Sequence, residues 1–343
     1  MAEPDDATAA PKAPEQPASD VRADEPAVEV QPTMPQPPPT PKVVAVVGEI
    51  PFTGLAIARE LIRSGTTARV LCPDAETEAA LTRACPANGL AELQCVRGTL
   101  ESDALKSVLA GAYGVAFVSP ISLNGRIYRG AQHLDDARRI AQAADAAGVR
   151  RLLYHSALGA QPVSPTLALS QAAAAEEIFA AMDCDTYRVR TSVVMGRGDG
   201  FQSEYVAQAK SGSPVMGMLG YGSTNVQPIH VNDLAKCVAR VFDPSRGAIS
   251  PGVLCIAGPE MTTPLDLADL ALARLGRIKL KIHTPLFVLR TLAAVRGDAA
   301  FKEKVNLLFE GFCTDHNDAF KLLGASVQLI TPQQSQDEIL AAA

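Results

Sequence analysis

One segment near residue 50 constrains the fold more than any other part of the chain. In VVAVVGEIPFTGLAIARELIRSG, residues 43–65, a short apolar run is followed by a glycine-containing turn and a helix pattern. The run Val43–Val47 is β-branched, as expected for a buried parallel strand, and the pattern Gly54–Ser64 is that of an amphipathic helix. This succession presents backbone N–H groups at a helix N-terminus, where they can bind a pyrophosphate. A purely structural strand–turn–helix connection has the same pattern, so both interpretations stay open.

Strand and helix patterns continue to alternate up to about residue 190. Further strands are expected at 68–71, 93–96, 114–118, 152–155 and 186–189, and helices at 102–110, 131–147 and 172–181. Alternation at this spacing is typical of a parallel sheet with helices on both faces. We therefore predict an α/β fold built on a Rossmann-type, doubly wound parallel sheet.

The alternation loosens beyond about residue 196. Gly, Pro and Ser dominate residues 196–228, and a helix at 232–241 and a strand at 253–256 follow. Such an insertion-rich part commonly forms a smaller lobe on the substrate side, over the strand ends. We expect one Rossmann domain over residues 42–343, with a C-terminal lobe from about residue 196.

The first 41 residues have a different composition. They contain eleven prolines, eight acidic and two basic side chains. Such a segment buries too little apolar surface to offset its ordering entropy, so we expect a disordered acidic tail. It lacks the apolar region of a secretory signal, and its early acidic residues argue against an organelle transit peptide. A proline-rich tail can dock on a protein partner or act as a solvated tether.

The net charge of −6 comes entirely from this tail, because the remaining chain has 29 basic and 29 acidic side chains. A neutral body gives no electrostatic reason to expect nucleic acid or an anionic membrane as partner. No stretch approaches the roughly 18–20 apolar residues of a membrane-spanning helix. We therefore expect no nucleic-acid partner and no transmembrane segment.

The seven cysteines indicate neither a disulfide framework nor a zinc site. Their number is odd, and no two form a Cys-x-x-Cys pair. Most lie in apolar stretches, such as those around Cys95 and Cys255, which is typical of buried, reduced thiols. This usage favours the cytoplasm or another reducing compartment.

Four segments follow one another in the order found in a known superfamily. They are the turn described above, GVRRLLYHSALGA at 148–160, TYRVRTSVVMGRGDGF at 186–201 and QPIHVNDLAKCV at 227–238. Over roughly residues 43–330 the chain resembles the atypical, extended-type short-chain dehydrogenases, above all the NmrA-like branch and relatives of the 39-kDa accessory subunit of respiratory complex I. The resemblance implies a fold that binds NAD(P)(H). The cofactor-binding residues that it implies are Gly48, Phe52, Thr53, Gly54, Ser119 and Ser156.

The chain departs from the family pattern where the cofactor would bind. The family turn reads Gly-x-x-Gly-x-x-Gly, but Pro51 occupies the middle position and lacks a backbone N–H. NADP-binding members carry Arg after the second strand, where residues 72–74 read Cys-Pro-Asp. After the third strand, Gly98-Thr99 replaces the family's Gly-Asp. The resemblance thus implies a weakened NAD(P)(H) site and does not decide between NAD and NADP.

The catalytic positions of the family have also changed. Its reductases use a Tyr-x-x-x-Lys pair and an upstream serine, and the lysine lowers the tyrosine pKa so that the phenol exchanges a proton as hydride moves. Ser156 matches the serine, but Leu167 occupies the tyrosine position and Gln171 the lysine position. Neither side chain is an acid or base near neutral pH. The resemblance therefore implies a pseudoenzyme without catalytic residues.

Other tyrosines are weak substitutes for the missing one. Tyr154 and Tyr187 are expected on strands and have no lysine four residues later. Tyr128 with His133 is a candidate displaced pair, although an ordinary helix surface accounts for both residues.

Three further motifs have structural explanations. His230 and Asp233 look like a metal pair, but we expect Asn232 or Asp233 to cap the following helix. Thr314 or Asp315 is expected to cap a helix near the C-terminus. Met216 and Met218 are expected in a loop near the pocket mouth, where they contact a ligand or fill space. No metal site is predicted.

Three hypotheses for the function remain. The first is a non-catalytic scaffold, redox sensor or assembly factor that still holds a nicotinamide dinucleotide. The second is an NAD(P)-dependent reductase or isomerase with a non-standard proton donor. The third is an interaction module with an empty Rossmann core, whose protein partner binds the N-terminal tail or the C-terminal lobe. The substrate, the partner and the oligomeric state stay open.

Overall fold

A computed structural model describes residues 42–119, 132–243, 245, 247–297, 299–307 and 309–341 of the 343-residue chain. The expected tail at 1–41 and Tyr128 of the candidate displaced pair lie outside the described residues.

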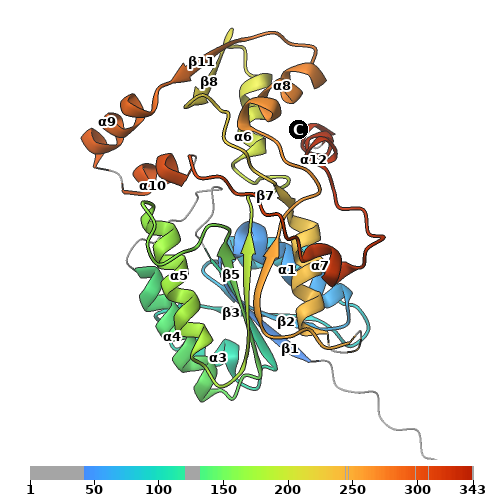
Figure 1. The fold of residues 1–343 in the computed structure, drawn as a ribbon. Helices are drawn as coiled ribbons and strands as arrows, with labels where there is room; N and C mark the ends of the chain where they lie inside the picture. The colour runs from blue at the N-terminus through green and yellow to red at the C-terminus, as the bar shows by residue number, and fades with distance from the viewer. Residues whose placement is uncertain are drawn as a thin grey trace, which may run out of the picture. The chain divides into compact units, whose positions relative to one another are not determined.

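Seven parallel strands form the central sheet, in the order β10-β6-β5-β4-β1-β2-β3 (Figure 1). The strand order reverses between β1 and β4, the place where doubly wound sheets bind ligands at the carboxyl ends of their strands. The predicted α/β, doubly wound Rossmann-type sheet is confirmed. The strands are β1 (Val43–Gly48), β2 (Thr67–Cys72), β3 (Leu93–Arg97), β4 (Gly114–Val118), β5 (Arg151–Ala157), β6 (Asp185–Thr191) and β10 (Gly252–Ile256).

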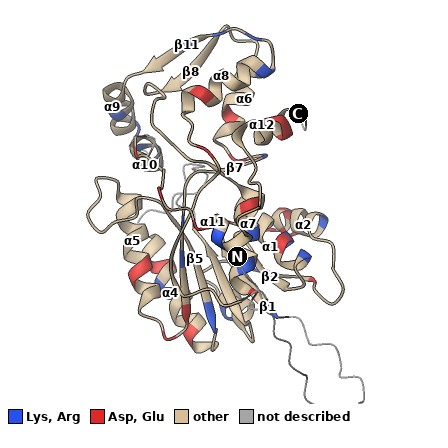
Figure 2. Cartoon of the chain, turned by 45° about the vertical axis from the view of Figure 1, so that its right-hand side comes forward, with Lys and Arg blue, Asp and Glu red and all other residues tan. Residues whose placement is uncertain are grey.

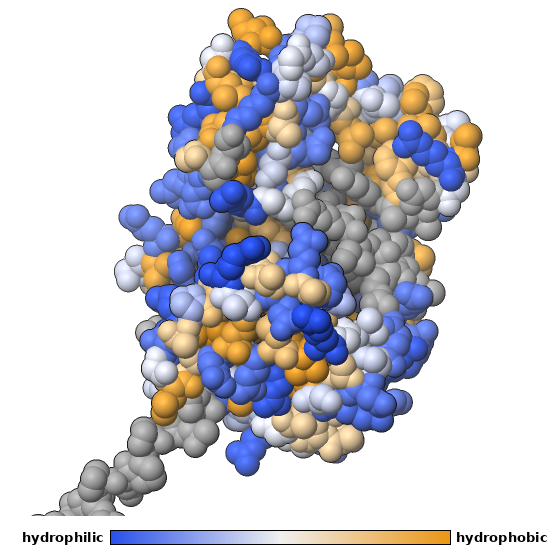
Figure 3. Space-filling view, turned by 180° about the vertical axis from the view of Figure 1, so that it is seen from behind, coloured by the Kyte–Doolittle hydropathy of each residue, from blue (hydrophilic) through white to orange (hydrophobic). Residues whose placement is uncertain are grey.

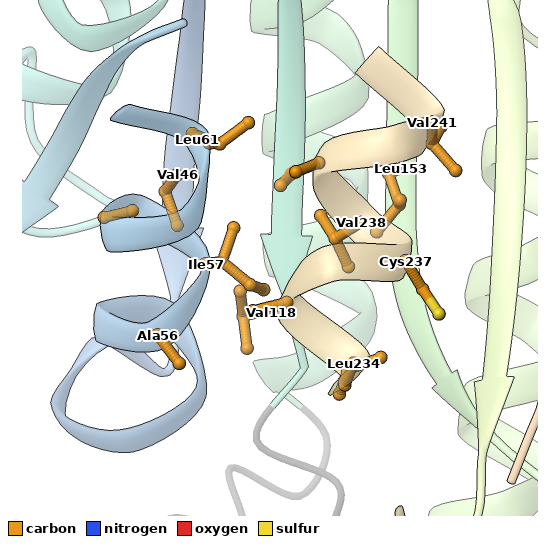
Figure 4. Close-up of a cluster of buried hydrophobic side chains, with 14 of the residues drawn as sticks. Val46, Ala56, Ile57, Leu61, Val118, Leu153, Leu234, Cys237, Val238 and Val241 are labelled. Carbon is orange, nitrogen blue, oxygen red and sulfur yellow. The ribbon is translucent and has the colours of Figure 1, made fainter. Parts of the chain in front are cut away.

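Helices cover both faces of this sheet, which is why its inner strands are apolar on both sides. On one face, side chains of α1 and α7 meet each other and the sheet, as Ile57, Leu234 and Val118 do in Figure 4. That face carries α1 (Leu55–Arg63), α2 (Ala75–Ala84), α7 (Val231–Phe242) and α11 (Ala319–Leu323). The other face carries α3 (Ala104–Leu109), α4 (Gln132–Ala146) and α5 (Leu167–Ala180).

Most of the remaining elements contribute to a separate apolar cluster, as do the first turns of α5. We call these elements the lobe; Figure 1 shows it beyond the carboxyl ends of the strands. The lobe consists of α6 (Gln202–Lys210), β8 (Val215–Leu219), α8 (Pro264–Arg274), β11 (Leu280–Thr284), α9 (Leu286–Arg296), α10 (Ala299–Leu307) and α12 (Pro332–Ala341). A short pair, β7 (Val194–Met195) and β9 (Ile229–His230), precedes α6 and α7.

The methionines at 216 and 218 do not lie in a loop, so that expectation is wrong. They belong to β8, which pairs in parallel with β11, and both side chains are buried in the lobe. Alternation along a strand sends them to the inner side of this two-stranded sheet. They fill space in the lobe core.

Helices α5 and α2 differ from the sequence-based expectation, as does α6, which lies in the Gly-, Pro- and Ser-rich stretch where no helix was predicted. Helix α5 begins at Leu167, five residues before the predicted start at 172, because the preceding leucines and alanine are also good helix formers. Helix α2 was not predicted, since its apolar positions are few. Asp74 caps it by accepting a hydrogen bond from the Thr77 N–H at 2.7 Å.

The cap of α7 is His230, not Asn232 or Asp233. The His230 Nδ1 accepts a hydrogen bond from the Asn232 N–H at 3.3 Å. The buried Asp233 carboxylate instead accepts from the Ile330 N–H at 2.7 Å, which ties α7 to the chain before α12. The expected helix cap therefore serves as a tertiary contact.

The cap expected at Thr314 or Asp315 is also wrong. Helix α11 begins after Asp318, whose carboxylate accepts from the Cys255 N–H of β10 at 2.9 Å. The Thr314 hydroxyl donates to the His316 carbonyl oxygen at 2.9 Å, within the preceding loop. The polar residues of this segment thus hold the loop and the edge strand β10.

All seven cysteines are free thiols. Cys72, Cys85 and Cys237 are buried, and the other four, including Cys95 and Cys255, are half-buried. Burial raises the pKa of Cys85 to about 11, so that this thiol stays protonated at neutral pH. The expectation of burial thus holds fully for three of the seven.

Candidate functional site

The carboxyl ends of β1, β4 and β5 bring several predicted cofactor-binding residues to one edge of the sheet. Gly48 lies opposite Val118 at the ends of β1 and β4, and Val118 lies opposite His155 in β5. Ser119 and Ser156 follow Val118 and His155, and both are buried. This edge is the point where the strand order reverses. Whether these residues contact a dinucleotide stays a prediction.

Two glycines of the turn are required by the backbone around them. Gly48 has φ +106°, and a Cβ there would lie 2.1 Å from the Val118 carbonyl oxygen. A Cβ on Gly54 would lie 2.6 Å from the Glu49 carbonyl oxygen. Both glycines are therefore explained by close packing, with or without a ligand.

The turn between β1 and α1 is a π-helical turn, Ile50–Gly54, whose N-terminal N–H groups are occupied by the chain itself. The Glu49 carboxylate accepts hydrogen bonds from the Phe52 N–H at 3.0 Å and from the Thr53 N–H at 2.9 Å. Backbone N–H groups at a helix start are the donors that typically bind a phosphate. A pyrophosphate that used them would have to displace Glu49.

Pro51 is compatible with this arrangement. It occupies the first turn of the π-helical segment, where its missing N–H would have no helical acceptor. Its fixed φ suits a helix start. Pro51 and Glu49 together make a turn that is complete without a ligand.

The region where the ribose would bind is also internally bonded. The hydrogen bond from the Thr77 N–H holds the pKa of Asp74 below its usual range, so this carboxylate is committed to capping α2. The Thr99 N–H donates to the Ser102 Oγ at 3.0 Å. Arg97, at the end of β3, pairs with Glu78 of α2. The basic side chain at the end of β3 thus already has a carboxylate partner.

Ser156 forms part of a buried three-residue clamp. Its hydroxyl donates to Glu176 at 2.6 Å, and the Arg190 guanidinium donates to the same carboxylate at 2.9 Å and 2.7 Å. Ser156 and Glu176 are both buried. The clamp joins β5, α5 and β6, and its two parallel Arg–carboxylate bonds make it strong. The serine therefore has a structural hydrogen-bond partner.

Sequence analysis did not identify Glu176 or Arg190 as site residues. Arg190 lies inside the motif segment at 186–201, and Glu176 interrupts an alanine-rich helix. A carboxylate among buried alanines is a usable signal, because it needs a charged partner.

The first turn of α5 holds no acid–base pair. Leu167 is half-exposed at its start, and Gln171 is buried one turn later. Glu303 of α10 accepts a hydrogen bond from the Ala168 N–H at 3.2 Å, and Glu310 accepts from the Thr166 hydroxyl at 2.9 Å. Two carboxylates, one on α10 and one just after it, thus contact the start of α5. The positive end of the helix dipole stabilises negative charge there.

Tyr154 is paired with His133, at 2.8 Å between the phenol oxygen and Nε2. Both side chains are buried, so the expectation that His133 lies on a helix surface is wrong. Burial raises the pKa of Tyr154 well above its usual value, which keeps the phenol protonated. Tyr187 donates to the Ile249 carbonyl oxygen at 3.0 Å and also has a structural role.

Within the described ranges, no group of three or more His, Cys, Asp or Glu side chains could hold a metal ion. Among the same residues, no helix combines the length and apolar character needed to cross a membrane.

Curated relatives match part of the chain. It is 24% identical over 262 residues to the NADH dehydrogenase [ubiquinone] 1 alpha subcomplex subunit 9, mitochondrial, of Arabidopsis thaliana. It is 31% identical over 214 residues to the ceramide reductase of Caulobacter vibrioides. These matches cover 74% and 60% of this chain, which spans 63% of the length of each relative. No family model matches the chain.

Solved structures match over a larger share. The NADPH-dependent quinone oxidoreductase of Escherichia coli, complexed with NADPH, has a TM-score of 0.67 at 18% identity, covering 87% of this chain and 99% of that chain. The UDP-glucuronic acid 4-epimerase of Bacillus cereus, in complex with UDP-glucuronic acid and NAD, has a TM-score of 0.67 at 12% identity, covering 88% and 100%. At these identities the likeness shows the fold.

These findings confirm the resemblance to atypical, extended-type short-chain dehydrogenases. The chain has a Rossmann-type fold like that of these NADPH- and NAD-bound structures. Among curated proteins, it is similar to a subunit of mitochondrial NADH dehydrogenase and to a reductase.

Proposed function

We propose that this chain is a non-catalytic protein of the short-chain dehydrogenase type, acting as a scaffold, redox sensor or assembly factor. The observation that carries the proposal is at the start of α5, where Leu167 and Gln171 replace the phenol and the ammonium of the family. Neither side chain exchanges a proton near neutral pH, and Ser156 is bonded to Glu176. Hydride transfer to a carbonyl would lack its proton donor.

Dinucleotide binding in this proposal is weak. Glu49 holds the two N–H groups that a pyrophosphate would use, so binding requires that its carboxylate move away. Backbone contacts from the edge of the sheet stay available to either NAD(H) or NADP(H). A weakly held dinucleotide suits a sensor better than a tightly bound prosthetic group.

The likeness to a subunit of mitochondrial NADH dehydrogenase supports an accessory role within a larger assembly. A protein partner, contacted through residues 1–41 or through the lobe, is part of the proposal.

One titration series tests the proposal. The full chain is mixed with NADH and with NADPH while nicotinamide fluorescence and calorimetric heat are recorded, and turnover is then assayed over a panel of aldehydes, ketones and quinones. We expect weak binding without turnover. Turnover that Ser156→Ala abolishes would overturn the non-catalytic assignment. Binding of neither dinucleotide up to millimolar concentration would instead leave an interaction module with an empty core.

The double change Leu167→Tyr with Gln171→Lys sharpens the result. If the pocket still accepts a carbonyl substrate, this variant gains measurable NAD(P)H oxidation, while Leu167→Phe with Gln171→Met, of similar size but without acid–base groups, does not. Inactivity of both variants would mean that the substrate pocket itself is lost.

The likeness to ceramide reductase favours one second candidate, an NAD(P)-dependent reductase of a ceramide-type lipid. Its proton donor would be Tyr154, hydrogen-bonded to His133 at 2.8 Å, and substrate access would require that this fully buried phenol become exposed. Adding ceramide-type ketones to the substrate panel tests it. Turnover that Tyr154→Phe removes, in a variant of unchanged thermal stability, would establish this candidate over the first.

A further inference from the structure

The outer side of the β8–β11 sheet is apolar and uncovered among the described residues. Val215 pairs with Leu280 and Gly217 with Ile282, and residues paired in this way project to the same side of a sheet. Val215, Leu280 and Ile282 are exposed, whereas Met216 and Met218 on the opposite side are buried. Ile278, just before β11, is 100% exposed. The lobe thus uses one side of this small sheet as core and leaves the other in solvent.

Helix α9 follows β11 in the chain and also exposes apolar side chains. Its buried side chains are Leu289 and Ala293, which attach it to the protein. A second apolar stripe points to solvent and follows helical spacing, at Val288, Leu292 and Val295. Val295 is 80% exposed, and the neighbouring Phe287 is 72% exposed. Figure 3, seen from behind, shows hydrophobic residues in orange interspersed with hydrophilic ones in blue at the lobe end of the molecule.

The same segment is basic. Residues 277–297 contain five Lys or Arg side chains and no Asp or Glu, in a chain whose net charge is −6. Arg277 and Lys279 bind backbone carbonyl oxygens, so that no carboxylate neutralises them in these contacts. Arg290 and Arg296 lie on α9 (Leu286–Arg296), and both are exposed; Figure 2 colours basic residues blue on this helix. Among the described residues, Lys281 is the one of the five that pairs with a carboxylate, that of Asp269 in α8.

We use the term outer face for the exposed apolar side chains of β8, of β11 with Ile278 before it, and of α9, together with the two arginines of α9. We propose that the outer face binds the surface of an anionic lipid bilayer. Its residues are Val215, Ile278, Leu280, Ile282, Phe287, Val288, Arg290, Leu292, Val295 and Arg296. A helix with Phe, Val and Leu facing outward and Arg beside them lies in the plane of a membrane interface. The apolar side chains enter the acyl boundary while the arginines reach the headgroups.

Charge decides between this occupant and a second copy of the chain. Two outer faces in a symmetric dimer would oppose basic residues to basic residues, which disfavours the contact. A bilayer with acidic lipids attracts the arginines and accepts the apolar side chains at once. The neutral average of residues 42–343 hid this concentration, because the balancing acidic residues lie elsewhere in the chain. The inference goes beyond the proposed function and is independent of dinucleotide binding.

Vesicle flotation of the full chain tests the proposal. Vesicles of phosphatidylcholine alone are compared with vesicles containing one quarter phosphatidylglycerol, at low and high salt. We expect binding to the anionic vesicles that weakens with salt. The change Phe287→Glu with Val295→Glu should reduce binding about tenfold or more, and Arg290→Gln with Arg296→Gln about fivefold per residue.

Val163→Glu is the matched control, because Val163 is 90% exposed and lies outside the outer face. It should bind vesicles like the unchanged chain, and thermal melting should show that all variants are folded. Absence of flotation with anionic vesicles at low salt would overturn the proposal, as would unchanged binding by Phe287→Glu with Val295→Glu. A dimer in light scattering that this double change dissociates would assign the face to a second copy instead.

Discussion

The turn after β1 and the outer face of the lobe differ in whether their binding groups already have partners within the chain. At the turn, the donors that make a dinucleotide-binding fold recognisable are bonded to Glu49 of the same chain. On the outer face, no recognisable motif exists, yet large apolar side chains such as Phe287 and Val295 are left in solvent. The comparison teaches that the region with the known motif is complete in itself, whereas the region without a motif is the one that lacks a partner.

The physical basis of the difference is the cost of leaving a group unmatched. Backbone N–H groups at a helix start are strong donors, and a carboxylate three or four residues earlier satisfies them at little entropic cost. Exposed apolar side chains gain about 25 cal/mol for each Å² removed from water, and nothing described in this chain removes them. Association with a partner therefore has more to gain at the outer face than at the turn.

The largest effect is expected at the Ser156 clamp, which makes the sheet edge self-contained. Arg190→Met leaves the buried Glu176 carboxylate without its cationic partner. We expect a loss of about 4 kcal/mol in the free energy of unfolding, measured by urea denaturation. Adding Glu176→Leu should recover most of the loss, because the pair is then replaced by apolar groups.

A loss of less than about 1 kcal/mol for Arg190→Met would contradict the clamp and would free Ser156 for another role. Ser156→Ala alone should cost only about 1 kcal/mol, the net value of one hydrogen bond.

Gly48→Ala tests whether the turn is fixed by packing. The new Cβ would lie 2.1 Å from the Val118 carbonyl oxygen, in a residue with φ +106°. We expect a loss of about 3 kcal/mol in the free energy of unfolding. Gly297→Ala is the control, because Gly297 has φ +61° but no atom within 4 Å of its Cβ position. It should lose only about 1 kcal/mol; equal losses at both sites would mean that packing at the turn is loose.

His155, at the carboxyl end of β5 on the same edge, is buried. Burial lowers its pKa to about 4, and its ring hydrogen bonds to the Thr191 hydroxyl at 2.8 Å. The unfolded imidazole has a pKa near 6.5, so between pH 6.5 and pH 4 the unfolded chain takes up a proton that the folded chain does not. Stability should therefore fall with acidification, by on the order of 3 kcal/mol across this window.

The measurement is urea denaturation at several pH values, for the unchanged chain and for His155→Gln. The difference in slope between the two isolates His155 from other titrating groups. If the free energy of unfolding depends on pH equally in both chains, the pKa of His155 is not lowered by burial.

The sequence predicts the sheet well because its strands are continuous apolar runs; the pattern at 114–118 coincides with β4. It misses α2, whose polar sequence has little periodicity, and the β8–β11 pair, which joins segments far apart in the chain. At the candidate site, motif order places Gly48 and Ser156 at one edge. The partners of these residues depend on side-chain geometry across elements, so Glu176 and Arg190 could not be inferred from spacing.

Glu49→Ala is expected to change stability little. It tests most directly whether the turn after β1 is closed by its own carboxylate. Removal of the carboxylate frees the Phe52 and Thr53 N–H groups, at a cost of about 1 kcal/mol for the lost cap. It also removes a negative charge from the place where a pyrophosphate would bind. NADH and NADPH affinities, measured by nicotinamide fluorescence, should rise about tenfold, because a charge-assisted contact is gained and a repulsion lost.

Glu76→Ala is the matched control, because Glu76 is an exposed acidic residue in the first turn of α2 and Asp74 remains there as cap. It should leave both affinities unchanged. If Glu49→Ala binds no more tightly than Glu76→Ala, the carboxylate is not what keeps the turn closed, and Pro51 becomes the next position to change. If affinity rises while turnover stays absent, the turn is a masked binding site in a protein without catalytic groups, and the contrast with the uncovered outer face stands.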